Sequence, residues 1–323
     1  MFEHLTAGRY IFLLRALSDL NLPAYKGSTL RGGFGQALKR VTCALRNQDC
    51  RQCLLRERCV YLYLFETPPP ADAAMMRLYP SAPHPFVIEP PASTQRLVAG
   101  GDPLDFGLVL VGRALDYLPY FVYAFVALGE LGLGRQRGKF SLEKVEAANG
   151  DRWISVYDQE HKTLQRSPAC LTGETMQNRS RELAGRQQLT LDFLTPTRIK
   201  SAEHLVEQPE FHHLIRTLLR RLSSLSYFHC GHKPDLDFRG LIERSQKIER
   251  VSAHLHWHDW ERYSSRQKQH MLLGGFLGSV TYSGDFDEFL PLLAWGEVLH
   301  VGKAASFGLG QYQISIGGRN EEA

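Results

Sequence analysis

Four of the six cysteines fall within 17 residues, at Cys43, Cys50, Cys53 and Cys59. Their spacing is C-x6-C-x2-C-x5-C, and the other two, Cys170 and Cys230, are remote in sequence. Clustered thiols in a reducing compartment indicate metal binding rather than disulfides. Four thiolates from one loop can surround a tetrahedral zinc ion and leave no open coordination position. The pattern predicts a structural zinc site, with an iron–sulfur cluster or unligated thiols as alternatives.

A second candidate is the glycine-rich segment 302–310, which lies between a predicted helix and the last predicted strand. The residues able to bind a phosphate there are Gly302, Lys303, Ser306, Gly308 and Gly310. Glycines let backbone N–H groups approach a phosphate, and a lysine adds positive charge. The segment is not a nucleotide-binding P-loop, because it follows a helix and its Gly-Lys pair is at the wrong end. A simple tight turn is the alternative.

Three histidines, His254, His256 and His258, alternate with apolar residues 253, 255 and 257. On a strand the three imidazoles would share one face while the apolar side chains pack against a core. Metal binding is possible at this spacing, but a place in an RNA groove or a polar interface fits better. The run continues with Trp257, Trp260, Arg262, Tyr263 and Arg266, which mixes aromatic rings with forked donors suited to RNA.

The charge distribution favours a nucleic-acid partner. The net charge is only +4, but residues 1–60 hold ten Lys and Arg against four Asp and Glu, and residues 212–270 hold eleven against six. Arginine outnumbers lysine by 28 to 10. A guanidinium group can fork onto a phosphate or stack on a base, which an ammonium group cannot. A solvated basic face is the bland alternative.

The composition, with 43% hydrophobic and 22% charged residues, is that of an ordinary globular protein. The longest apolar run, residues 120–128, is too short to span a bilayer, and the start of the chain has no secretion signal. We therefore expect a soluble, cytoplasmic protein with no membrane partner. A length of 323 residues suggests two domains of roughly 150 residues each.

Hydrophobic periodicity predicts the same order of elements twice. In the first half we expect strands at 9–17, 86–88, 106–111 and 139–147, and helices from residue 28 or 29 and over 116–131. In the second half we expect strands at 188–195, 250–257, 275–282 and 312–316, and helices at 210–228 and 286–299. The first strands are about 180 residues apart, and the Gly132 and Gly308 turns are 176 apart.

This order predicts an α+β chain of two tandem ferredoxin-like (RRM-like) β-α-β-β-α-β domains. We expect an amino-terminal domain over residues 1–150, carrying a Cys-rich metal-binding insertion at about 43–66. The carboxyl-terminal domain is expected over residues 185–318, with the glycine-rich loop at 302–310. Helices would cover one face of each sheet and leave the other free for RNA or a partner domain.

Four motifs in this order carry a family resemblance. They are residues 22–35 (LPAYKGSTLRGGFG), the cysteine cluster running into 59–68 (CVYLYLFETP), 257–267 (WHDWERYSSRQ) and 300–310 (HVGKAASFGLG). Together they resemble the CRISPR-associated endoribonucleases that process precursor guide RNA. They are more closely similar to a cysteine-cluster branch within the RAMP superfamily, the repeat-associated proteins with a glycine-rich loop. The resemblance covers nearly the whole chain.

The resemblance implies a protein that binds one CRISPR repeat RNA and cuts it at the 3′ side without a metal ion. In that chemistry the 2′-hydroxyl attacks the adjacent phosphate and leaves a 2′,3′-cyclic phosphate. The reaction needs a base, an acid and cations that stabilise the developing charge. Relatives of other branches often carry a catalytic histidine at the first helix, but this chain has no histidine between His4 and His84.

The resemblance therefore assigns roles only in part. We expect His300 to transfer protons, with His258 as the second candidate, and Lys26 to stabilise charge at the reacting phosphate. Arg31, at the start of the first helix, is expected to bind RNA together with Arg262, Arg266 and the residues of the glycine-rich loop. Each of these residues has a structural alternative, since Lys26 and Arg31 suit plain phosphate binding and His300 suits a helix end.

Two other functions remain open. The missing first-helix histidine favours a non-catalytic RNA-binding RAMP subunit of a CRISPR effector complex, which would bind the repeat and leave it whole. A zinc-dependent DNA-binding regulator is weaker, because no recognition helix or dimer seam follows the cysteines.

Overall fold

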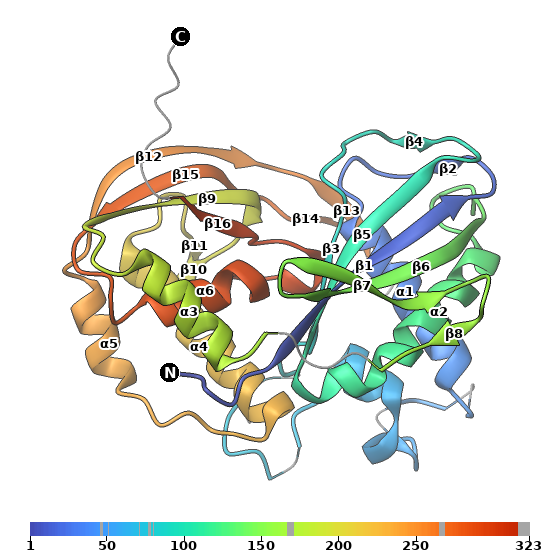
Figure 1. Cartoon of the computed structure of the whole chain (residues 1–323), viewed down its shortest axis with the longest axis horizontal. Coiled ribbons are helices and arrows are strands. Elements are labelled where there is room, and N and C mark those ends of the chain that lie inside the picture. The colour runs from blue at the N-terminus through green and yellow to red at the C-terminus, as the bar shows by residue number, and fades with distance from the viewer. Residues whose placement is uncertain are drawn as a thin grey trace. The chain divides into compact units, whose positions relative to one another are not determined.

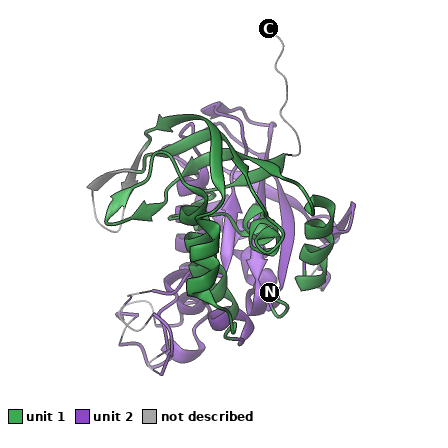
Figure 2. Cartoon of the chain, turned by 90° about the vertical axis from the view of Figure 1, so that its left-hand side faces the viewer, with its two compact units in different colours: residues 1–4, 172–226, 233–323 green, residues 5–171, 227–232 purple. Residues whose placement is uncertain are grey.

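The computed structural model describes residues 1–45, 48–50, 52–70, 72–76, 79, 81–166, 171–264 and 269–315, with the backbone alone for 261–264 and 269–272. The chain divides into two compact units (Figure 2). The amino-terminal unit comprises residues 5–171 and 227–232. The carboxyl-terminal unit comprises residues 1–4, 172–226 and 233–323.

The amino-terminal unit is built on an antiparallel sheet with the strand order β3-β5-β1-β6-β7-β8 (Figure 1). The strands are β1 (Ala7–Ala16), β3 (Phe86–Glu89), β5 (Pro103–Val111), β6 (Phe140–Asn149), β7 (Arg152–Asp158) and β8 (Thr163–Leu164). A small ribbon pairs β2 (Leu20–Asn21) with β4 (Leu97–Val98). The helices are α1 (Gly27–Thr42) and α2 (Leu118–Leu131), with short turns η1 (Arg56–Arg58), η2 (Leu62–Glu66) and η3 (Gly112–Tyr117).

Alternation along β1 explains which face of this sheet is covered. Tyr10, Phe12 and Leu14 are fully buried, while the residues between them are only half-buried. The buried side contacts α1 and α2, where the Phe34 ring stacks on Phe121 with centroids 4.5 Å apart. Successive strand residues point to opposite faces, so the arrangement places one apolar face under both helices.

The segment Gly112–Leu131 is long and apolar enough, by length and composition, to cross a membrane. In the structure it forms η3 and α2 of the amino-terminal unit, where Phe121, Phe125 and Leu128 are at most 1% exposed. Core helices of soluble proteins pass the same test, and α2 packs as one.

The carboxyl-terminal unit repeats the pattern with the strand order β12-β15-β9-β16. Its strands are β9 (Gln188–Thr197), β12 (Glu249–His258), β15 (Gly275–Ser283) and β16 (Tyr312–Ser315), all paired antiparallel. Short ribbons pair β10 (Lys200–Ser201) with β11 (His204–Leu205), and β13 (Glu261–Ser264) with β14 (Gln269–Leu272). The helices are α3 (Gly173–Leu183), α4 (Phe211–Cys230), α5 (Phe238–Ser245), α6 (Leu290–Leu299) and the 3-10 turn η4 (Ala305–Phe307); the last turn of α4 groups with the other unit.

The two sheets confirm the tandem ferredoxin-like prediction. In each unit the first strand lies between the third and the fourth, and the second strand is at the edge. Such an order follows when both crossover helices return the chain to the same sheet. The predicted apolar face of the long second-half helix is also confirmed, because Phe211, Leu214, Leu218, Leu222 and Leu225 are all buried.

Several elements differ from the expectation. The helices α3 and α5 and the hairpins β7–β8 and β13–β14 are absent from the prediction. The helix expected from residue 286 begins at Leu290, after a hydrogen-bonded turn from Phe286. On β12, the edge strand of its sheet, the apolar residues expected to pack in a core do not: Trp257 is 37% exposed, and Ala253 and Leu255 are only half-buried.

Candidate nucleic-acid interface

The glycine-rich loop follows α6 and is hydrogen-bonded to itself and to the end of β9. Val301 N–H donates to the Gly310 carbonyl at 2.8 Å, which closes the loop on itself. Lys303 N–H donates to the Arg198 carbonyl at 2.9 Å, and the Thr195 hydroxyl donates to the Gly308 carbonyl at 2.8 Å. These bonds hold the loop in one shape against the end of β9.

Two glycines of this loop are required by close backbone approach. A Cβ atom at Gly310 would lie 1.8 Å from the Val301 carbonyl oxygen, and one at Gly302 would lie 2.6 Å from that of Arg198. Both residues also have positive φ angles, +75° and +91°. Any other residue would break the closure, because L side chains clash in that region.

His300 is fully buried at the junction of α6 and the loop. Its Nδ1 lies 3.1 Å from the Leu309 carbonyl, and since a carbonyl only accepts, Nδ1 carries the proton and donates. Its backbone has φ +62° and ψ 161°. This imidazole braces the loop from inside, so contact with an RNA hydroxyl requires the loop to open.

A cluster of cations surrounds the exposed Lys303 side chain. Burial lowers the pKa of Lys303, and the charges of Lys200, Arg198 and Arg220 lower it further, while Glu203 alone raises it. Glu203 is already ion-paired with Lys200. The site thus carries more positive than negative charge, and like charges held this close favour an anionic partner.

Arg198 is the most constrained member of this cluster. Its Nε is buried and has no hydrogen-bond partner among the described residues, and burial lowers its pKa. A buried unsatisfied N–H is costly unless a ligand completes it. Arg198, Lys200 and Arg220 were missed by sequence reasoning. The signal for the first two was the Thr-Arg-Ile-Lys sequence at residues 197–200, one residue after the predicted strand.

Ser306 is nearly buried inside η4, and its position contributes to the shape of the loop rather than to its surface. Arg262 lies on β13, whose side chains are outside the described residues, and Arg266 lies outside them entirely. Their predicted RNA contacts therefore stay predictions.

The three histidines of β12 do share one exposed face, as their spacing predicts. His258 lies at the end of the strand, where it pairs in register with Gly275. Next to it the Trp257 indole N–H donates to Asp259 at 2.8 Å. Among the predicted proton donors and acceptors, His258 is accessible and His300 is not.

In the amino-terminal unit, Lys26 is a buried side chain, only 1% exposed. Its Nζ donates to the Ser93 carbonyl at 2.6 Å and to the Ala24 carbonyl at 3.4 Å. Burial lowers its pKa. The ammonium group thus joins the start of α1 to the segment before β4, and its hydrogen bonds are made to backbone carbonyls.

Arg31 lies one turn further along α1, beside a histidine that sequence reasoning did not place there. Its Nη2 is 2.9 Å from Nε2 of His84, and the guanidinium lies 4.4 Å from the centre of the Phe65 ring. A guanidinium only donates, so Nε2 accepts, and Nδ1 of His84 donates to the Thr67 hydroxyl at 2.8 Å. The fold thus places His84 beside the first helix, although it lies 53 residues after Arg31 in the sequence.

The four clustered cysteines are half-buried free thiols between α1 and η2. Their sulfurs are not gathered into one group: among the described residues, only Asp158, Glu160 and His161 form a set of three or more donors within 4.8 Å of one another. The zinc prediction therefore rests on the donor chemistry and the spacing.

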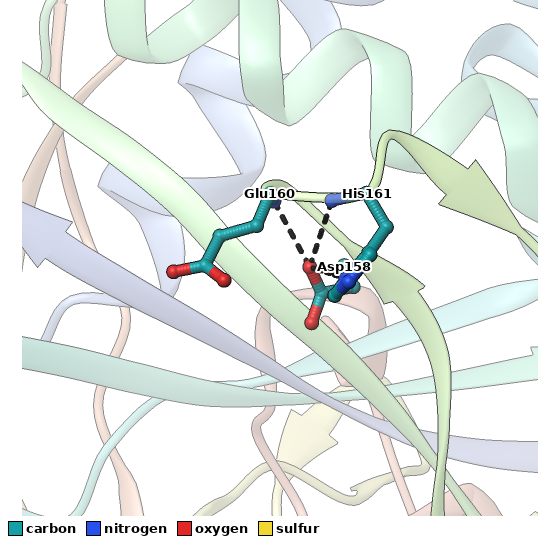
Figure 3. A group of neighbouring side chains, drawn as sticks. All are labelled: Asp158, Glu160 and His161. Carbon is teal, nitrogen blue, oxygen red and sulfur yellow. Dashed lines mark hydrogen bonds and ion pairs between the residues drawn. The ribbon is translucent and has the colours of Figure 1, made fainter.

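The group of Asp158, Glu160 and His161 closes a turn. Asp158 Oδ1 accepts from the backbone N–H groups of Glu160 at 2.9 Å and His161 at 3.2 Å, as well as from His161 Nδ1 (Figure 3). The Glu160 carboxylate points away from the other two side chains in Figure 3. The backbone hydrogen bond from His161 lowers the pKa of Asp158, as expected for a turn-capping carboxylate.

Two family models match the chain. The AF_1859_N model, described as an N-terminal domain, matches residues 5–169, and the model of CRISPR-associated endoribonuclease Cas6 matches residues 191–312. An uncharacterized protein of Archaeoglobus fulgidus is 26% identical over 296 residues, which cover 91% of this chain and 93% of that protein.

Solved structures of similar fold include Cas6 proteins. A Cas6 product complex matches with a TM-score of 0.57 and 17% identity over 96% of this chain and 99% of that chain. Thermus thermophilus Cas6 matches at 0.53 and 15%, over 96% and 99%. A partial Cas6-RT-Cas1–Cas2 complex matches at 0.57 and 15%, over 96% of this chain and 46% of that one. The tandem ferredoxin-like fold is therefore shared with Cas6.

Proposed function

The chain belongs to the AF_1859_N family through residues 5–169 and carries a Cas6 domain at residues 191–312, and from this premise we propose that it is an endoribonuclease that cuts CRISPR repeat RNA. The substrate assignment also draws on the solved relatives, one of which is a Cas6 in a product complex. Other CRISPR proteins are proposed as further partners, as in the Cas6-RT-Cas1–Cas2 complex. The proposal places the protein in the cytoplasm, where the repeat is transcribed.

The observation that carries the proposal is the cation cluster at the glycine-rich loop. Arg198, Lys200 and Arg220 lie near Lys303 of this fixed loop, and Glu203 is the acidic residue whose charge opposes theirs at Lys303. Phosphate contacts supply most of the affinity for a nucleic acid and position it on the protein. Two of these cations are arginines, which grip a phosphate with two parallel N–H bonds.

We propose cleavage without a metal ion. The 2′-oxygen forms a bond to the adjacent phosphorus as its proton passes to a base, and the bond from phosphorus to the 5′-oxygen breaks as that oxygen takes a proton from an acid. The products are a 2′,3′-cyclic phosphate and a free 5′-hydroxyl, so no water or metal-bound oxygen is consumed. Positioned acids and bases contribute roughly 100- to 10,000-fold to such steps.

The exposure of the two imidazoles favours His258 over His300 for proton transfer, since His258 is exposed and His300 fully buried. Lys303 and Arg198 suit the negative charge that builds on the phosphate. Lys26, which is bonded to backbone carbonyls, suits the positioning of α1 better than contact with the substrate.

The test is cleavage of the host's repeat RNA in EDTA, beside the same RNA with one 2′-deoxy nucleotide before the cut. We expect one cut in the normal RNA and none in the deoxy RNA. Lys303→Ala and Arg198→Ala should each weaken binding and reduce the salt dependence by about one counterion. Arg239→Ala is the matched control, because Arg239 is exposed on α5 and paired with Glu243.

Cutting of the deoxy RNA, or a requirement for a divalent ion, would contradict the proposed chemistry. A repeat that is bound tightly and stays whole would instead identify a non-catalytic RNA-binding subunit of an effector complex. The burial of His300 is the observation that favours this second function.

We also propose that Cys43, Cys50, Cys53 and Cys59 hold one structural zinc ion. Four thiols without a disulfide, on one segment of 17 residues, suit tetrahedral zinc, and zinc would supply only cross-linking of that segment. Elemental analysis should find about one zinc per chain, and Cys50→Ser with Cys53→Ser should remove it and lower the unfolding midpoint. Acid-labile sulfide with visible absorbance would indicate an iron–sulfur cluster instead.

A further inference from the structure

A pocket of about 470 Å³ opens along one side of α1 in the amino-terminal unit. Its walls are formed by Gly32, Gln36, Lys39 and Arg40 of α1, and by Tyr61 and Phe65 from the segment that contains η2. The helix residues follow one another at the three- and four-residue spacing of a single helix face. The volume is within the range of about 300–1,000 Å³ that small-molecule ligands occupy.

The described side chains that line this pocket carry a net positive charge. No acidic residue is among those that line it. Lys39 and Arg40 both line the pocket. In the described part of the chain, neither of them has an ion-pair partner. Both cations lie in the last turn of α1, where they interact favourably with the negative end of the helix dipole. The free charge favours an anionic group at this end of the pocket.

The opposite wall is aromatic. Lys39 Nζ lies 5.4 Å from the centre of the Tyr61 ring, and Tyr61 stacks on Phe65 with centroids 5.5 Å apart. The Arg31 guanidinium also lies over the Phe65 ring, 4.4 Å from its centre. A ligand that suits both walls has a flat apolar part and an anionic part, which is the make-up of a nucleotide.

Gly32 supplies independent evidence for a ligand. The three glycines of the Arg31-Gly-Gly-Phe-Gly sequence lie inside α1, where glycine is less stable than alanine. Gly33 and Gly35 are explained by packing, since a Cβ there would lie 2.9 Å from Leu128 and 2.2 Å from Phe65. A Cβ at Gly32 would meet nothing within 4 Å. Packing within the chain therefore gives no reason for Gly32, whereas a ligand lying against the helix backbone does.

We infer that this pocket is a nucleotide subsite, which takes one nucleotide with its base against Tyr61 and Phe65 and its phosphate at Lys39 and Arg40. The inference rests on the proposed function for the source of that nucleotide, an unpaired residue of the repeat RNA. Its lining comes from one side of α1, from Cys43 of the cysteine cluster and from the segment that contains η2, so the subsite adds a contact that the glycine-rich loop does not make. A free mononucleotide has the same chemical groups, and the test below distinguishes binding of a mononucleotide from binding of RNA.

The test uses the full chain as purified, with Gly32→Ala, Lys39→Ala and the control Arg239→Ala. We expect Gly32→Ala to raise the unfolding midpoint by about 1–3 °C and to weaken repeat binding at least fivefold. Lys39→Ala should weaken repeat binding by a similar factor, while Arg239→Ala leaves it unchanged. Binding of the four 5′-mononucleotides to each protein is measured by calorimetry in parallel.

The outcomes separate the subsite from the proposed function. If wild type binds repeat RNA and the two pocket variants bind it equally well, and no mononucleotide binds, the subsite is overturned while the endoribonuclease proposal stands. If repeat RNA does not bind but a mononucleotide does, and Gly32→Ala weakens it, the subsite stands and the RNA proposal fails. Weakened RNA binding with no mononucleotide binding supports a subsite that acts only within a longer strand.

Discussion

His300 occupies a backbone conformation that glycine adopts at the matching point of the other unit. The residue that ends α2 is Gly132, with φ 86° and ψ 151°, and the residue that ends α6 is His300, with φ 62° and ψ 161°. This region is almost restricted to glycine, and a side chain there costs roughly 1–3 kcal/mol. The strain is offset by the bond from Nδ1 to the Leu309 carbonyl, so the imidazole is retained for its contact with the loop.

This reading predicts different results for two substitutions of His300. Asparagine can place a side-chain N–H near the position of Nδ1 and so replace the bond that offsets the strain, so His300→Asn should keep the loop and leave cleavage within about threefold of wild type. His300→Ala should lose about 1–3 kcal/mol of stability, because the carbonyl is left unsatisfied. His258→Ala should slow single-turnover cleavage at least about 100-fold while repeat binding is retained.

Single-turnover rates and unfolding midpoints for the three variants check this prediction. Loss of cleavage in His300→Asn with an unchanged midpoint would return the proton-transfer role to His300. Full activity in His258→Ala would remove His258 from the reaction.

At the residue scale, the sequence indicated the loop but not its charged neighbours. The glycines and Lys303 were visible as a motif. Arg198 directly after β9, Lys200 of β10 and Arg220 of α4 come close to Lys303 only in the fold. His84 was missed for the same reason, since 53 residues separate it from Arg31. Contacts between remote segments leave no periodic signal in one sequence.

At the element scale, the start of α4 carries a pH-sensitive contact. The Glu210 N–H donates to Nδ1 of His213, so that nitrogen must be unprotonated. Burial lowers the pKa of His213, and the positive charges of His212, Arg216 and Arg250 lower it further, against the opposing effect of Glu210. The pKa of His212 is lowered as well, first by burial and then by Arg216.

The sign of the pH effect follows from these directions. Both histidines have a lower pKa in the folded chain than their ordinary value of 6.5, so the unfolded chain binds more protons below that pH. Stability should therefore fall as the pH drops from 7 towards 5. His213→Asn keeps an acceptor for the Glu210 N–H without a titrating group, and thermal melts should show a smaller fall for it than for wild type. An equal fall in both proteins would contradict this origin of the pH dependence.

The same scale shows which elements a sequence reveals. Strands and helices with a fully buried stripe, such as β1 and α4, were predicted to within a few residues. The helix α3 buries only Gly173, Met176 and Leu183, so its sequence has no clear apolar period. The strand β7 is mostly exposed and lacks a core face for the same reason. Elements that pack with little apolar surface are the ones that periodicity cannot identify.

At the scale of the whole molecule, the repeated order of elements was sufficient to predict two sheets with one strand order. The sequence did not predict correctly which residue of one repeat corresponds to which residue of the other. The sequence suggested that Gly132 corresponds to Gly308, but the structure aligns Gly132 with His300, since both end the second helix of their unit. The loop before β16 is longer, so its Gly-Leu-Gly sequence lies further from the end of the helix than the one in the first repeat. The two sequences were matched because their residues are the same, although they stand at different positions in the two repeats.

The division into units also differs from a split in the middle of the chain. Residues 1–4 group with the carboxyl-terminal unit, and residues 227–232 group with the amino-terminal one. Within the latter, His229 Nε2 donates to the Pro83 carbonyl at 2.8 Å, and the Tyr63 hydroxyl contacts its Nδ1 at 3.3 Å. The Gly112 backbone also lies against the His229 carbonyl, which leaves no space for a side chain at Gly112.

The chain therefore passes from one unit to the other four times, after residues 4, 171, 226 and 232. A cut after residue 171 would give two fragments, each lacking a segment that its own unit contains. Expressed alone, each fragment should be poorly soluble or melt far below the intact chain, whereas the two expressed together should complement each other into a nicked, active heterodimer. Independent folding of both fragments to full stability would show that the exchanged segments contribute little. For anyone who builds split reporters or circular permutants from this scaffold, the exchanged segments decide where the chain can be opened.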